Sequence, residues 1–293
     1  MGATIIDHGI DRGLAWHYGD PLREQRWLED GTGVVDLANR QVVRITGPDR
    51  RALTGDPPDG GSVRSQGDGV SCARDDGATT TGSTYWLSPQ GMIIGRFAWV
   101  EVEDAVWGWI EGCRLEQNPC RLTLQGGAFF ELDIAVEARP DMTMRWSGQP
   151  GPICRSGTPD CLGGHELFLP RGTPLAGRPV GIWAHTVRRI GAGVPRVGVD
   201  TDQRTLPAEL SPLGSPRRLV RLHLDGSAER FLDPATPLVL ADGPSGAVGF
   251  LGSMSYHREL GPIALGLVDA AIDASTTLLA DGVPASVEEL APV

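Results

Sequence analysis

The N-terminal part of the chain alternates between helical and extended hydrophobic patterns. Residues 21–28 combine apolar and charged positions at helical spacing. Asp20, directly before them, is typical of a helix cap, and Pro21 is typical of a first helical turn. Two short runs rich in β-branched residues, 33–37 and 41–45, predict strands. We therefore expect one helix followed by two strands.

A β-hairpin is predicted further along the chain. Residues 85–87 and 92–102 are extended apolar runs, and the turn between them has a proline and a glycine at the positions that a type I turn favours. The segment 104–116 has apolar residues on adjacent helical faces and predicts a helix. Large apolar side chains are rare between residues 55 and 84, which indicates a long loop.

Short strands dominate the C-terminal part. Residues 219–224 alternate, with Val220, Leu222 and Leu224 on one face. Turns rich in Gly, Asp and Pro separate further strands at 237–240, 247–251 and 263–268. This spacing predicts a small antiparallel β-barrel.

The order of strands and helices predicts an α+β fold. A helix is expected at 184–191, between strands before and after it. A Ser/Pro/Gly cluster at 210–216 marks a domain boundary. We therefore divide the chain into an α+β region, 1–209, and a barrel domain, 210–293.

Composition narrows the possible functions. The 293 residues carry a formal net charge of -11, spread along the chain, so no nucleic-acid partner is expected. All 26 basic residues are arginine, so any fixed cation in a site is an arginine or a metal. There is no signal-peptide pattern and no apolar run long enough to span a membrane. We expect a cytoplasmic protein without a membrane partner.

Few residues suggest chemistry by themselves. The five cysteines and six histidines show no metal-ligand spacing, so no metal is expected. Glu131 and Asp133 would share one face if 129–134 is a strand, and such a pair could serve as acid and base. A solvated strand face fits the same pattern, so both interpretations stay open.

The stretch from Trp183 to Glu209 carries the most specific pattern. An arginine, a Gly-x-Pro step, a Gly-x-Asp step and a Pro-x-Glu step follow one another at Arg189, Gly193, Pro195, Gly198, Asp200, Pro207 and Glu209. In this order and spacing the chain resembles the aminomethyltransferase (glycine-cleavage T-protein, GcvT-like) family, and within it the folate-binding YgfZ branch. Segments at 16–26, 44–50, 222–226 and 260–265 extend the resemblance over most of the chain.

The resemblance implies ferredoxin-like α+β domains around a central cavity, followed by a C-terminal antiparallel barrel. It also implies a small-molecule ligand in that cavity, with tetrahydrofolate as the possible cofactor, and a connection to iron–sulfur enzyme maintenance. Arg189 and Arg196 are candidates for an anionic tail, Trp183 and Trp146 for apolar walls, and Glu209 for a polar contact.

Three departures from the family limit this inference. The Lys-Gly-Cys-Tyr-x-Gly-Gln-Glu motif that YgfZ proteins carry after the Pro-x-Glu step is missing. Gly95 stands where T-proteins have an Asp that positions folate, and Gly191 falls near the position of the Glu that contacts the pterin. We therefore expect a ligand-binding protein without the cysteine chemistry of the family.

Two alternatives stay open. The chain could be a repurposed enzyme of secondary metabolism, catalysing cyclisation or group transfer in the same cavity, with Glu131, Asp133 or Asp200 as catalytic acids. Asp200 and Glu209 could instead be structural ion-pair partners of nearby arginines. The sequence leaves the oligomeric state open.

Overall fold

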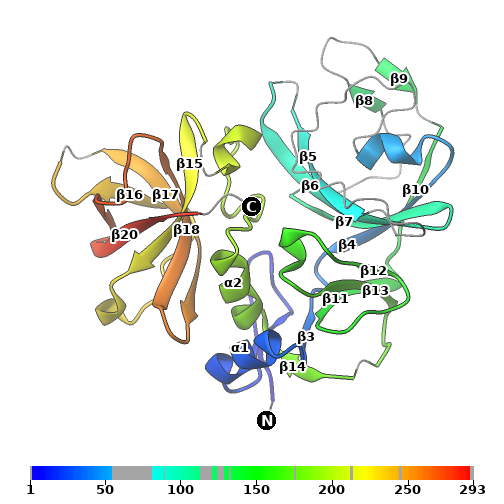
Figure 1. Cartoon of the computed structure of the whole chain (residues 1–293), viewed down its shortest axis with the longest axis horizontal. Helices are drawn as coiled ribbons and strands as arrows, with labels where there is room; N and C mark the ends of the chain where they lie inside the picture. Colours follow the sequence, from blue (N-terminus) through cyan, green and yellow to red (C-terminus); the bar gives the residue numbers. More distant parts are fainter. Residues whose placement is uncertain are drawn as a thin grey trace.

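Two five-stranded sheets and a closed six-stranded barrel make up the fold (Figure 1). The computed structural model describes residues 2–54, 81–88, 90–112, 121–123, 129–131, 133–174, 176–211, 214–243 and 246–290. Two small strand pairs lie outside the sheets: β1 (Thr4–Ile5) with β2 (Ala15–His17), and β8 (Arg121–Thr123) with β9 (Phe129–Glu131). Sheets with few helices confirm the α+β class expected from the sequence.

The first sheet is antiparallel throughout. Its strands are, in spatial order, β10 (Ala135–Ala138), β4 (Gln41–Thr46), β7 (Ala105–Glu111), β6 (Ile93–Val102) and β5 (Thr81–Leu87). The hairpin predicted for β5 and β6 is confirmed. Most of the long loop expected between residues 55 and 84 lies outside the described residues, but residues 81–84 belong to β5.

The helix predicted at 104–116 is wrong, because the described part of this segment forms β7. Trp107 and Trp109 point into the core between the two sheets, while Val106 and Ile110 pack in a separate core on the opposite face. A strand buried on both faces has a nearly continuous apolar run, and such a run also fits a buried helix.

The second sheet is mixed and is joined to two helices. Its strands are, in order, β12 (Cys154–Arg155), β13 (His165–Pro170), β11 (Met142–Ser147), β3 (Gly33–Asp36) and β14 (Arg178–Val180), with β14 parallel to β3. Helix α1 (Pro21–Glu29) begins at the predicted cap, where Asp20 Oδ1 accepts the Arg23 N–H at 2.9 Å. Helix α2 (Ile182–Gly191) confirms the predicted second helix.

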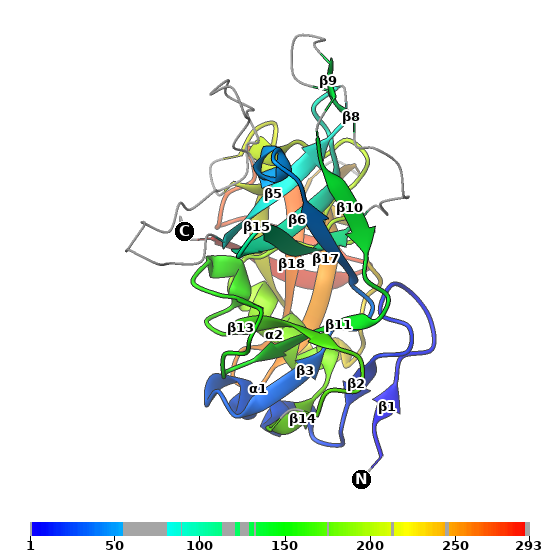
Figure 2. The ribbon, with the colours of Figure 1, turned by 90° about the vertical axis from the view of Figure 1, so that its right-hand side faces the viewer.

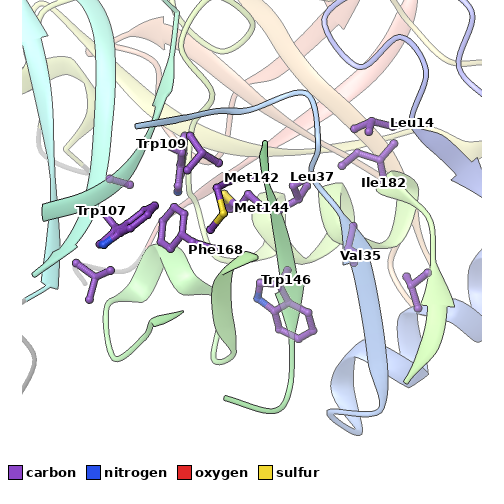
Figure 3. Close-up of a cluster of buried hydrophobic side chains, with 14 of the residues drawn as sticks. Leu14, Val35, Leu37, Trp107, Trp109, Met142, Met144, Trp146, Phe168 and Ile182 are labelled. Atoms are coloured by element: carbon purple, nitrogen blue, oxygen red, sulfur yellow. The ribbon is translucent and has the colours of Figure 1, made fainter. Parts of the chain in front are cut away.

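A hydrophobic core joins the two sheets. Figure 2 shows the first sheet above the second, and Figure 3 shows the side chains that fill the space between them. Trp109 from the first sheet and Met144, Trp146 and Phe168 from the second are all buried in this cluster. The two sheets are therefore parts of one packed body.

The C-terminal barrel is closed, as the sequence predicted. Its strands are, in order, β15 (Arg217–Leu224), β18 (Gly261–Asp269), β17 (Ala247–His257), β16 (Thr236–Leu240), β19 (Thr277–Ala280) and β20 (Val283–Glu289). Val220, Leu222 and Leu224 share the barrel interior. Leu219 points outward and packs with Val187 and Ile190 of α2. Helix α2 thus lies against the outer wall of the barrel (Figure 1).

Short 3₁₀ helices complete the connections: η1 (Arg50–Thr54), η2 (Pro159–Cys161), η3 (Pro207–Leu210) and η4 (Gly226–Ala228). Within the described residues, no helix is long and apolar enough to cross a membrane.

The strand expected at 129–134 is shorter than predicted. Strand β9 ends at Glu131, and Asp133 lies beyond it, where its backbone N–H donates to Asp49 Oδ2 at 2.9 Å. The expectation that Glu131 and Asp133 share one strand face is therefore wrong. The backbone hydrogen bond from Asp133 ties the chain to the end of β4, where it enters β10.

Candidate functional site

Helix α2 lies between the sheets and the barrel and carries different chemistry on its two faces. One face presents Ile182, His185 and Arg189 to a small closed cavity. The other face presents Ala184, Val187 and Arg188 to a wider cleft. The apolar side chains of the helix that face the barrel hold it in place.

Three arginines are among the nine residues that line the closed cavity. Its volume is about 10 Å³, which is room for about one water molecule. The lining residues are Asp11, Leu37, Asn39, Arg40, Ile182, His185, Thr186, Arg189 and Arg196. Burial, reinforced by Arg40 and Arg189, holds the pKa of His185 well below its ordinary value, so this imidazole is neutral.

Asp200 binds the buried guanidinium of Arg189. Its Oδ2 lies 2.8 Å from Arg189 Nη1 and also accepts the Arg196 N–H at 2.7 Å. Its Oδ1 accepts the Ser253 N–H at 2.6 Å, and the Ser253 hydroxyl donates to Oδ2 at 3.1 Å. Both carboxylate oxygens are thus engaged, and they connect α2 to barrel strand β17.

Arg196 is held by two carboxylates. Its guanidinium makes a two-pronged contact with Asp11, at 2.6 and 3.0 Å, and a 3.2 Å contact with Glu111. Burial, the largest single effect, raises the pKa of each carboxyl, but Arg196 together with Arg40 and other neighbouring donors outweighs it, so the pKa of Asp11 and of Glu111 lies below the ordinary value. Two carboxylates therefore already balance the charge of Arg196, which makes it a poor partner for an anionic tail.

The buried arginines and carboxylates around the closed cavity and between the two sheets are equal in number. Five arginines meet five carboxylates there: Arg40, Arg96, Arg155, Arg189 and Arg196 pair with Glu166, Asp160, Asp200, Asp11 and Glu111. Such a network fixes the packing of the two sheets and α2, because each buried charge needs its partner. The charges of this network balance without a further anion, although Nε and Nη2 of Arg189 are buried without a hydrogen-bond partner among the described residues.

The wider cleft has a volume of about 200 Å³ and lies between α1, α2 and the end of β17. It is lined by Gln25, Leu28, Glu29, Ala184, Val187, Arg188, Gly191 and His257. Apolar side chains from both helices form part of the wall, and polar groups surround them, which is the usual character of a small-molecule site. A Cβ atom built on Gly191 meets nothing within 4 Å, so the cleft is open at that position.

The predicted aromatic contacts lie apart from one another. Trp146 is 1% exposed, and its indole N–H donates to the Cys161 carbonyl at 2.8 Å, so it belongs to the core rather than to a cavity wall. Trp183 is half-buried in an aromatic cluster with Trp16 and Tyr256, and its indole N–H donates to the Tyr256 carbonyl. Neither side chain lines the closed cavity or the cleft.

The predicted acids are also dispersed. Glu209 is buried and holds the backbone N–H of Leu206 and the guanidinium of Arg217. Asp133 is exposed. The side chain of Glu131 lies outside the described residues. Of the predicted residues, Arg189 and Arg196 come together at the closed cavity, and Asp200 bonds to both of them.

Cysteine chemistry has no support at the two cysteines that are described. Burial raises the pKa of the Cys161 thiol to about 12, so it stays protonated at neutral pH. Cys154 is partly buried on strand β12. In the described part of the chain, no cluster of three or more His, Cys, Asp or Glu side chains could hold a metal ion.

Comparisons with known proteins agree with this architecture. No protein-family model matches the chain, and no curated protein sequence matches it. Among solved structures, the chain is similar to glycine cleavage system aminomethyltransferase T from Bartonella henselae, with a TM-score of 0.69 over 99% of this chain and 94% of that one. The chain shares the aminomethyltransferase T fold. At 16% identity the similarity establishes the fold alone, and it confirms the fold class that the sequence predicted.

Sequence reasoning singled out Gly191 of the cleft but missed the charged side chains there, Arg188 and Glu29. Arg188 and Arg189 are neighbours in the sequence, but successive residues of a helix point about 100° apart. Arg188 therefore lines the cleft, while Arg189 lines the closed cavity. A helical projection of residues 182–191 could have separated the two arginines. No local signal in the sequence brings Gln25 and His257 to the same cleft.

Proposed function

We propose that the protein binds a small anionic molecule, folate-like or simpler, in the cleft between α1, α2 and the barrel. The observation that carries the proposal is a partly buried arginine, Arg188, which lines the cleft and forms no ion pair within the described residues. The closed cavity around Arg189 and Arg196 is a weaker candidate, because its charges are already paired and it has room for about one water molecule.

The resemblance to T-proteins supports the cleft as the ligand site. Gly191, near the position of the pterin-contacting Glu of T-proteins, lines the cleft rather than the closed cavity. A volume of about 200 Å³ is below the roughly 300–1,000 Å³ of drug-sized pockets, so one ring system fits and a whole folate would extend into solvent. Membership of the YgfZ branch and use of tetrahydrofolate, held through the carboxylates of its glutamate tail rather than through its pterin, are parts of this proposal.

Binding is favoured over catalysis by the surroundings of the acids. The oxygens of Asp200 are engaged by Arg189 and Ser253, and Glu209 is engaged by Arg217. Neither acid lines the cleft. A repurposed enzyme would need a proton-transfer group at the ligand, and nothing in the cleft favours that alternative specifically.

The test is a calorimetric titration with 5-formyltetrahydrofolate and with benzoate, a flat anion that fits a small site. The informative variant is Gly191→Leu, which fills the cleft at a position with open space around its Cβ. The matched control is Gly246→Leu, at the other end of β17, where a Cβ also meets nothing within 4 Å. We expect the native protein and the control to bind at least one ligand and Gly191→Leu to bind neither. Binding unchanged by Gly191→Leu would contradict the proposal.

A further inference from the structure

The acceptor groups of the cleft are already occupied. Both oxygens of Glu29 contact the guanidinium of Arg258, at 3.2 and 2.9 Å. The buried amide of Gln25 is used at both ends: Nε2 donates to the Tyr256 carbonyl at 2.8 Å, and Oε1 accepts the Arg258 N–H at 2.9 Å. A ligand that enters the cleft therefore finds its acceptors already engaged.

His257 has its tautomer set by the turn that follows it. Its Nδ1 accepts the backbone N–H groups of Glu259 and Leu260, each at 3.1 Å. A nitrogen that accepts two N–H groups carries no proton, so in the neutral ring the proton is on Nε2. Burial lowers the pKa of His257, so the ring is neutral near pH 7. His257 thus contributes a hydrogen-bond donor to the site.

Arg188 is a donor that is held in place. Its Nε donates to the Leu162 carbonyl at 2.6 Å, and its guanidinium carbon lies 5.4 Å from the centre of the Trp146 ring. These two contacts orient the planar guanidinium before any ligand arrives. Its Nη1 and Nη2 groups make no ion pair with a carboxylate of the described residues. Glu29, the opposite charge that acts on Arg188, is held by Arg258.

We infer that the cleft selects a ligand which presents hydrogen-bond acceptors and negative charge, namely a compact flat carboxylate, held by Arg188 and His257 with its apolar part against Leu28, Ala184 and Val187. This inference deepens the proposed function and rests on it. It assigns a direction to the hydrogen bonds that the ligand makes. The side-chain acceptors of Gln25 and Glu29 already bind N–H groups of Arg258, whereas Arg188 and His257 offer donors that have no carboxylate partner at this site among the described residues.

The same polarity argues against a pterin head group in the cleft. A pterin presents an amino group and a ring N–H on one edge, and these donors need a carboxylate or carbonyl acceptor. The glycine at position 191 supplies no side-chain acceptor, and the nearby Gly191 carbonyl already accepts Arg221 Nη1 at 2.9 Å. A donor edge facing Arg188 would also leave the guanidinium without an acceptor, and an unpaired buried polar group is costly.

The experiment uses two probes of almost the same shape, benzoate and its neutral amide benzamide, together with 6-methylpterin. We expect the native full-length protein to bind benzoate about tenfold or more tightly than benzamide, since a hydrogen bond to a charged group contributes about 1.5–3 kcal/mol. It should bind 6-methylpterin more weakly than benzoate. Arg188→Gln and His257→Phe should each remove most of the preference for benzoate, while far-UV circular dichroism confirms that the variants are folded.

A third variant tests polarity without removing a native contact. Gly191→Glu adds an acceptor at the open position, so it should weaken benzoate binding and strengthen 6-methylpterin binding. Equal affinity for benzoate and benzamide, or tighter binding of 6-methylpterin by the native protein, would overturn the inference and leave the proposed function standing. If neither benzoate nor 5-formyltetrahydrofolate binds, the proposed function itself is lost.

Discussion

The two faces of helix α2 differ in how their arginines are used. On one face, Arg189 is 2% exposed and is paired with Asp200, beside a cavity with room for about one water molecule. On the other face, Arg188 lines an open cleft and has no carboxylate partner within the described residues. Two adjacent arginines thus have different roles. Arg189 belongs to a buried ion pair that also contacts the barrel, and Arg188 offers its charge to the cleft.

This contrast teaches that a matched arginine does not identify a ligand site by itself. Arg189 is part of the spacing by which the sequence resembles T-proteins, but Asp200, eleven residues later, pairs with it. An arginine at a protein surface or cavity is available for a ligand when no carboxylate of the chain reaches it. The sequence raised such a pairing of Asp200 with a nearby arginine as one alternative, and the structure shows it with Arg189.

The largest expected difference between the two faces is in stability. Arg189→Met leaves the buried carboxylate of Asp200 without its main counter-charge, and we expect it to lower the free energy of unfolding by about 3–5 kcal/mol. Arg188→Met loses one hydrogen bond to a carbonyl and the contact with Trp146, and should cost about 1–2 kcal/mol. Urea unfolding of both variants measures the difference, and equal losses would contradict the distinction between the faces.

Acid should destabilise the protein on the Arg189 side of α2, by protonating the two carboxylates that bind Arg196. The pKa values of Asp11 and Glu111 are lowered in the folded state, so their contribution is fully present above the unfolded values of about 4. It is lost as the pH falls through the folded values, because protonation removes the charge. We expect the free energy of unfolding to fall as the pH drops from 6 to 3, because both carboxyl groups favour the folded state only while they are charged.

Urea midpoints measured across that pH range provide the check, with Asp11→Asn as the comparison. Because this variant has already lost one of the two carboxylates, its stability should depend less steeply on pH below about 4.5. A slope identical to that of the native protein would show that Asp11 does not contribute.

Much of the fold could be predicted from the sequence, for reasons that are local. Asp20 and Pro21 fix the start of α1, and the alternation at 219–224 fixes the inner face of β15. The strand β7 could not be distinguished from a helix, because its apolar residues face two different cores. The order of the resemblance motifs also predicted the aminomethyltransferase T fold.

The site was less predictable, because it depends on contacts between residues far apart in the sequence. Gln25 meets the backbone of residues 256 and 258 across the domain interface. The tautomer of His257 depends on a turn whose geometry has no sequence signature. The sequence left open whether Asp200 pairs with an arginine, and it could not show that Asp11 and Glu111 would bind Arg196.

A smaller loss of stability is expected when the hydrogen bond between Asp200 and the barrel residue Ser253 is removed. Ser253→Ala removes the hydroxyl that donates to Asp200 at 3.1 Å and leaves the backbone N–H contact intact. We expect a loss of about 1–2 kcal/mol, since the hydrogen bond ends on a charged group but the carboxylate keeps three other partners. Ser253→Thr is the control: it keeps the hydroxyl and should recover part of the loss. A variant as stable as the native protein would show that the hydroxyl is dispensable.

The smallest effect should be a gain in stability on the open face. Gly191→Ala places a methyl group where a Cβ meets nothing within 4 Å, in the last turn of α2. Because alanine restricts the unfolded chain and favours the helix, we expect a gain of about 0.4–1 kcal/mol in the free energy of unfolding. Gly193→Ala is the matched control, because its φ of 67° and its Cβ position 2.9 Å from Leu290 Cδ1 both disfavour a side chain. That variant should lose about 1–3 kcal/mol. A gain in the free energy of unfolding for Gly191→Ala and a loss for Gly193→Ala would confirm that the end of α2 has open space at Gly191 but not two residues later.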